Sequence, residues 1–290
     1  MLFLQHTDVA LYKEGLTHPY EREHQALYRA YSFGPFRLLR GGEPVGEQMW
    51  RRSKAKTLLK WFLLNPGKLC SADEFIDLFW PNVSPETSLG NLHVTMHYLR
   101  HLLEPSLNSR EVSKFIQRRP NNFYCFHMGD IWWSDTTAVQ KLFETARELD
   151  RHGDCIKASF YYRKVVGYCS LGFLSEDIAE EWLTPYRQGY KHIYSQVLIR
   201  LIQIYLQRNE LDEALEYAYQ ALTLDPYCEP AVKAIIDVHL QQGNTIKATC
   251  TFDAFRNFLR RELGVGLSKE FHNLRKKIIV ACGENYPLEM

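Results

Sequence analysis

Three histidines, His93, His97 and His101, recur at every fourth position between Asn91 and Pro105. At 3.6 residues per turn this spacing places them along one side of a helix, where two imidazoles can chelate a metal ion. A zinc site usually takes three or four ligands from more than one element, and no cysteine or acidic residue nearby has ligand spacing. We therefore predict no metal, and we interpret the histidines as polar groups that face a partner or solvent.

The segments around these histidines predict a winged helix. Aromatic and aliphatic residues alternate between Tyr31 and the turn at 41–42, as they do in short antiparallel strands. Helical spacing of apolar residues follows between Ser53 and the stop at 66–67, and again between Ser71 and Pro81. A third helix is predicted from about Pro85 to Leu103. The last segment, KFIQRRPNNFYCFHM, alternates on both sides of 120–122 and predicts a hairpin.

The third helix has two different sides when its residues are placed 100° apart. One side carries the apolar residues Leu92, Met96, Leu99 and Leu103, and the other carries His93, His97, Arg100 and His101. Because the apolar side must face the core, the histidine side is left for the major groove of DNA. The predicted DNA contacts are these four polar residues, Arg118 and Arg119 on the hairpin, and Lys54 and Lys56 near the first helix.

The charge of the chain is unevenly divided. Residues 30–130 carry 13 Lys+Arg and 9 Asp+Glu, a net charge of +4, whereas residues 131–290 carry −2 and residues 1–29 carry −1. The excess of cations lies where DNA is expected, although +4 is small for a DNA-binding domain. We therefore expect DNA affinity to depend on a second bound protomer, giving a homodimer or paired monomers, or on a neighbouring protein.

After a junction at about 130–135 the pattern is helical throughout, and three short segments resemble one another. A turn residue, Gly153, Asn209 or Gly243, precedes an alanine by five positions, and the last two segments are 34 residues apart. This is the period of tetratricopeptide repeats, which present grooves to peptides, proteins or small molecules. Five tyrosines, if not simply packed between helices, could line an effector groove: Tyr161, Tyr162, Tyr186, Tyr190 and Tyr194.

Five segments together resemble the SARP-type transcriptional regulators, which join an OmpR-type winged helix to a tetratricopeptide-like bacterial transcriptional activator domain. The segments are FGPFRLLRGGEPV, FIDLFWP, NLHVTMHYLRHLL, IQRRPNNFY and FRNFLRRELGVGLSKEFHNLRKKI. The resemblance spans about 33–278 and implies a regulator, most often an activator, that binds direct repeats in promoters and helps to recruit RNA polymerase. Arg100 matches an arginine of the family's recognition helix, whereas His97 and Tyr98 replace its preceding Ser-Arg.

The predicted fold class is therefore mainly α, with an N-terminal winged helix (α+β) followed by an all-α tetratricopeptide-like domain. We expect an extension at 1–29, a DNA-binding domain at 30–130 and an activator domain at 131–290. The chain has no catalytic motif, no apolar run of membrane-spanning length and no C-x-x-C pair, so we expect a cytoplasmic, non-enzymatic protein without a cofactor. The alternatives are a protein-interaction scaffold that no longer reads DNA and a receptor for a small-molecule or nucleotide effector.

Overall fold

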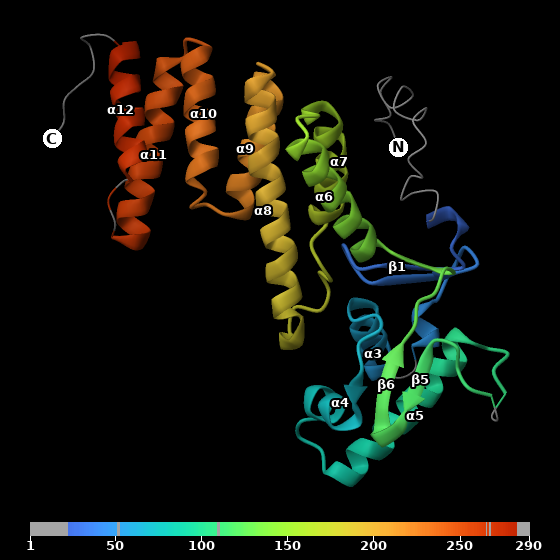
Figure 1. Cartoon of the computed structure of the whole chain (residues 1–290). Helices are drawn as coiled ribbons and strands as arrows, with labels where there is room; N and C mark the ends of the chain where they lie inside the picture. Colours follow the sequence, from blue (N-terminus) through green and yellow to red (C-terminus); the bar gives the residue numbers. More distant parts are fainter. Residues whose placement is uncertain (1–22, 51–52, 109–110, 265, 267, 283–290) are drawn as a thin grey trace. The chain divides into compact units, whose positions relative to one another are not determined.

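The computed structural model describes residues 23–50, 53–108, 111–264, 266 and 268–282. They form two compact units, one containing the chain up to Lys141 together with Leu171–Trp182, and the other containing Leu142–Ser170 together with the chain from Leu183 onward. The first unit is mixed α and β and the second is all-α (Figure 1). The predicted fold class is confirmed. The predicted extension at 1–29 lies mostly outside the described residues.

The first unit opens with a four-stranded sheet in the order β3-β2-β1-β7. Its strands are β1 (Tyr28–Tyr31), β2 (Arg37–Arg40), β3 (Glu43–Pro44) and β7 (Trp132–Ser134). β1 pairs antiparallel with β2 and parallel with β7, so that Ala30 lies opposite both Leu38 and Ser134. The segment 130–135, where the sequence predicts the junction between the two domains, supplies the fourth strand of this sheet, and both indoles of that strand are buried.

Three helices and a second sheet complete the winged helix. The helices are α3 (Ser53–Leu64), α4 (Ala72–Phe79) and α5 (Pro85–Leu103), and the sheet joins β4 (Cys70–Ser71), β6 (Phe123–Phe126) and β5 (Ile116–Arg119) in that order. Local signals set the boundaries. Ser71 accepts a hydrogen bond from the amide of Glu74 while the Glu74 carboxylate accepts one from the amide of Ser71, which is the capping box expected from the sequence.

The segment 171–182, which we name the strap, packs with the winged helix although it lies 40 residues beyond it in the chain. The strap is not helical over 171–180, so the expectation of helical structure throughout this part of the chain is wrong there. Its backbone hydrogen-bonds to the end of β1, with the amide of Leu174 donating to the carbonyl of Ser32 at 2.7 Å and the amide of Gly34 donating to the carbonyl of Gly172 at 2.6 Å. Phe33 and Phe173 also pair their rings at 5.8 Å.

Helix α6 (Asp135–Arg151) begins directly after β7. The buried carboxylate of Asp135 accepts hydrogen bonds from the amides of Ser32 at 2.6 Å and Phe33 at 2.8 Å, so the end of β1 is attached to the start of this helix. Burial raises the pKa of Asp135 to about 7, although the amide donors of Phe33, Ser32 and Thr136 oppose the increase.

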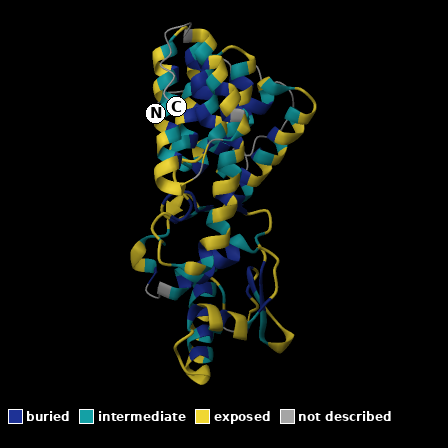
Figure 2. Ribbon diagram, turned by 90° about the vertical axis from the view of Figure 1, so that its left-hand side faces the viewer, coloured by how far each residue is buried: buried dark blue, intermediate teal, exposed yellow. Residues whose placement is uncertain are grey.

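The second unit is a stack of antiparallel helices that follow one another in the chain (Figure 1). They are the remainder of α6, α7 (Cys155–Cys169), α8 (Thr184–Gln207), α9 (Leu211–Leu224), α10 (Glu229–Gln241), α11 (Thr245–Leu263) and α12 (Lys269–Cys282). Figure 2 shows buried residues concentrated on the helix faces that meet within the stack. The repeat prediction is confirmed locally. The turn residues Gly153, Asn209 and Gly243 have positive φ, and each is followed five residues later by an alanine with no exposed surface.

Candidate nucleic-acid interface

The core side of α5 is the one that the sequence predicts. Leu92, Met96, Leu99 and Leu103 are each at most 1% exposed. Helix α5 packs against α3 and α4 of the winged helix, which fixes how far α5 is rotated about its axis. The opposite side of α5 is therefore directed away from the hydrophobic core.

The outermost line of α5 is formed by Gly90, Val94 and His97, which are all exposed, and by the half-buried His101. The rings of His97 and His101 lie 4.2 Å apart, and Nδ1 of His101 is 2.9 Å from the carbonyl oxygen of His97. Between Leu89 and Leu103 this helix carries no acidic residue. The line therefore presents imidazoles and one apolar side chain without a repulsive carboxylate.

His93 and Arg100 lie about 70–90° round the helix from the middle of this line and face the β5–β6 hairpin instead. The Nε of Arg100 donates to the carbonyl of Ile116 on β5 at 3.0 Å, and burial lowers the pKa of Arg100. Burial, followed by the positive charges of Arg118 and Arg100, also lowers the pKa of His93. The structure therefore divides the four predicted polar residues into two groups, of which only His97 and His101 lie on the outermost line.

The β5–β6 hairpin forms the wing. Asn121 and Asn122 both have φ of 58°, the left-handed conformation that asparagine tolerates in tight turns. Arg118 and Arg119 are exposed at the end of β5, and Arg118 donates to the side-chain oxygen of Asn122. Two guanidinium groups therefore extend from the wing, where they can reach phosphate oxygens.

The two predicted lysines of α3 differ in their surroundings. Lys54 is half-buried, whereas Nζ of Lys56 lies 2.9 Å from Glu47 and 3.1 Å from Glu176. Burial alone would lower the pKa of Lys56, and the two carboxylates more than compensate and raise it. A cation already bound by two carboxylates is a poor ligand for phosphate. Arg51 and Arg52 lie outside the described residues.

Sequence reasoning missed Val94, which is 46% exposed on the outermost line. The reason is that a division of α5 by polarity alone assigns every apolar residue to the core. The helical positions could have identified Val94, because it follows Gly90 by four residues and precedes His97 by three.

The two pockets that the structure describes are lined by none of the five tyrosines. Tyr161 and Tyr162 belong to α7, and Tyr186, Tyr190 and Tyr194 belong to α8. Tyr162 and Tyr190 are buried, and the Tyr194 hydroxyl lies 3.5 Å from the side-chain oxygen of Gln220. A pocket of about 570 Å³ in this unit is lined by other residues of α8 and α10, with Phe271 of α12. The effector groove at these tyrosines stays a prediction.

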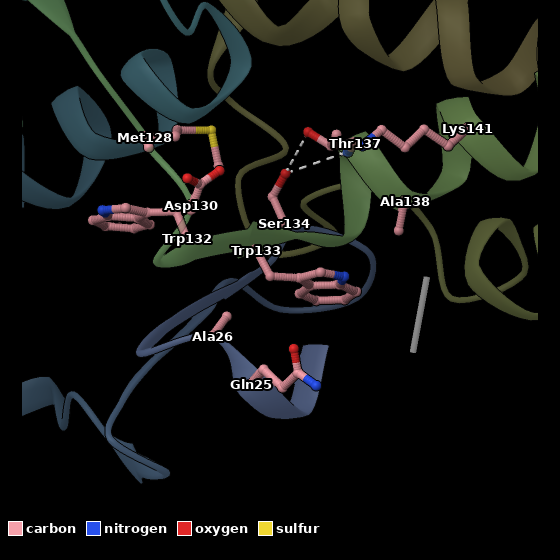
Figure 3. Close-up of a pocket in the computed structure, with 11 residues that line it drawn as sticks. Gln25, Ala26, Met128, Asp130, Trp132, Trp133, Ser134, Thr137, Ala138 and Lys141 are labelled. Atoms are coloured by element: carbon pink, nitrogen blue, oxygen red, sulfur yellow. Dashed lines mark hydrogen bonds between the residues drawn. The ribbon is translucent and has the colours of Figure 1, made fainter. Parts of the chain in front are cut away.

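A further pocket of about 400 Å³ lies in the first unit, where β7 passes into α6 (Figure 3). Figure 3 shows the Trp133 indole near Gln25, with the Lys141 side chain further along α6. Within the part of the chain that the structure describes, no three His, Cys, Asp or Glu side chains are grouped so that they could hold a metal ion. None of the described helices is long and apolar enough to span a bilayer.

Comparison with known proteins decides the family. The profile of the bacterial transcriptional activator domain matches residues 134–279, half of the chain. The chain belongs to this family. It is 23% identical over 275 residues to the regulatory protein AfsR of Streptomyces coelicolor and 23% identical over 258 residues to that of Streptomyces griseus. These matches cover 91% and 87% of this chain but only 25% and 24% of the relatives, so the chain spans about a quarter of their length.

The solved structure of Mycobacterium tuberculosis EmbR in complex with a low affinity phosphopeptide has the same fold. The TM-score is 0.74 at 15% identity, and the match covers 91% of this chain and 66% of that one. The SARP-type resemblance is confirmed by these findings, and both Streptomyces relatives bear the name of regulatory proteins.

Proposed function

We propose that this regulator binds promoter DNA sequence-specifically, with α5 in the major groove and the β5–β6 wing on the adjacent phosphate backbone. The observation that carries the proposal is the charge and shape of this surface. The outermost line of α5 has no acidic residue between Leu89 and Leu103, and the exposed Arg118 and Arg119 extend from the wing next to it. His97 and His101 can donate to or accept from base edges, while the arginines bind phosphates whatever the sequence.

The helical unit then has the role of contacting a partner. We propose that it binds RNA polymerase, a second protomer or another regulator at the promoter, and that two protomers occupy direct repeats. The stacked helices support this, since such repeats present extended surfaces that bind partners. In this proposal residues 30–130 read DNA and residues 131–290 activate transcription, except that the strap within the second range supports the winged helix.

In vitro selection tests the proposal. The full chain is used to select duplexes from a random library, and its affinity for the selected duplex is compared with that for a shuffled duplex. We expect the selected duplex to bind at least about a thousandfold more tightly. Arg119→Ala should weaken both, whereas Arg261→Ala, which removes an exposed arginine from α11, should weaken neither. Failure to enrich any duplex would favour the scaffold alternative.

A second function, the binding of a small effector, is favoured by the pocket beside Trp133. Its volume of about 400 Å³ lies within the range of small-molecule sites, and it combines an indole with the polar groups of Gln25, Thr137 and Lys141. Thermal shifts against a panel of nucleotides and metabolites test this function. A ligand whose stabilisation persists in a Trp133→Ala variant would not bind there.

A further inference from the structure

Gly90 is an unexpected residue in the sixth position of α5. Glycine in a helix interior costs about 0.5–1 kcal/mol relative to alanine, because the unfolded chain has more conformations to lose. Its φ is not positive, and a Cβ built at this position would meet no heavy atom within 4 Å. Nothing in the described part of the chain therefore requires a glycine here.

Val94, one turn further along α5, is unexpected for the opposite reason. It is an apolar side chain that remains 46% exposed on the same line as Gly90 and the exposed His97. The surrounding charges favour a polyanion as the occupant of this line, since α5 lacks carboxylates from Leu89 to Leu103 and the two exposed arginines of the wing extend next to it.

We propose that Gly90 and Val94 mark the closest approach of α5 to the base pairs, with Val94 packed against a thymine methyl group. The inference rests on the proposed function and names the base that this helix reads. The thymine methyl is the apolar group that the major groove presents, and a valine can exclude water from it. The missing side chain at Gly90 lets the helix backbone come close to the duplex, as glycine does where backbone and ligand meet.

The first test compares Gly90→Ala with Gly189→Ala in the full chain. Gly189 is a matched control, because it is also exposed, is the sixth residue of its helix α8, and has no heavy atom within 4 Å of the position that an added methyl group would take. Both variants should raise the unfolding temperature by about 1–4 °C. Only Gly90→Ala should weaken binding to the selected duplex, by about fivefold or more, because its methyl group overpacks the contact.

The opposite changes of stability and DNA affinity separate this role from a purely structural one. If Gly90→Ala binds the duplex as tightly as the unaltered chain, the inference is wrong while the proposed function stands. If the unaltered chain binds no duplex specifically, the proposed function itself fails.

The second test locates the methyl contact. Each thymine of the selected duplex is replaced in turn by deoxyuridine, which removes only the methyl group. At one position the unaltered chain should lose about fourfold in affinity, whereas Val94→Ala, already lacking the contact, should lose less than about twofold. Equal losses for both proteins at every position would overturn the assignment of Val94, and so would the absence of any sensitive thymine.

Discussion

Asp177→Ala should destabilise the winged helix, because it removes the nearest counter-charge of a buried cation. The Lys60 side chain is only 4% exposed, and its Nζ lies 2.5 Å from Oδ2 of Asp177 and 3.5 Å from Oε1 of Glu176. Removing one partner of a buried ion pair costs about 3–5 kcal/mol. Glu176 remains within reach and Asp177 is partly exposed, so we expect a smaller loss of about 2–3 kcal/mol in the free energy of unfolding.

Lys60→Met combined with Asp177→Ala should recover most of this loss. The double variant contains neither the buried cation nor its main partner, and methionine can keep the contact with the Phe36 ring, which Nζ of Lys60 approaches to 5.2 Å from the centroid. Its stability should lie within about 1 kcal/mol of the unaltered chain. Asp253→Ala, which breaks a partly exposed pair with Arg256 within α11, serves as a control and should cost less than about 1 kcal/mol.

The assay is hydrogen exchange at the Leu174 amide, which donates to the carbonyl of Ser32 and therefore reports the opening of the strap. Urea unfolding followed by tryptophan fluorescence gives the corresponding global value. The reasoning would be refuted if Asp177→Ala left the protection of the Leu174 amide from hydrogen exchange unchanged. It would also be refuted if the double variant were no more stable than Asp177→Ala alone.

Three further predictions concern pH and the wing. Burial raises the pKa of Asp135 to about 7, so between about pH 4 and pH 7 the folded state holds a proton on this carboxyl group that the unfolded state releases. The free energy of unfolding should therefore fall as pH rises through this range, by at most about 4 kcal/mol from this group. Asp135→Asn should remove that part of the pH dependence from the urea midpoints. Burial lowers the pKa of His239, so stability should fall as pH drops below 6.5, and His239→Leu should lack this decrease. Arg100→Ala should lower the free energy of unfolding by about 1 kcal/mol, because the Ile116 carbonyl loses its donor. Arg118→Ala should instead leave the melting temperature nearly unchanged. In anisotropy titrations it should weaken DNA binding to all sequences alike.

Local signals made much of the fold predictable. The Ser71 and Glu74 capping box, Pro85 at the start of α5 and the asparagines of the wing each act within a few residues, and the structure has all three elements at the expected places. The core side of α5 was predictable for the same reason, since helical periodicity assigns apolar residues to one side.

Contacts between distant segments were not predictable in this way. The strap joins Phe173 to Phe33, and β7 pairs with β1 across about a hundred residues of chain, and no local pattern encodes such partners. The same limit affected the candidate site. Whether Arg100 faces outward or toward Ile116, and whether Lys56 is free or bound to Glu176, depends on elements packed against them rather than on their own helices.

The dependence of duplex affinity on salt tests the central claim most directly. Titration of the full chain with the selected duplex between about 50 and 200 mM salt should give a linear fall of log affinity against log salt. The slope should be about −3.6 to −5.4 for about four to six phosphate contacts, and Arg118→Ala should reduce its magnitude by about one. Weak binding that does not change with salt, or an unchanged slope in Arg118→Ala, would contradict a DNA-reading surface made of α5 and its wing.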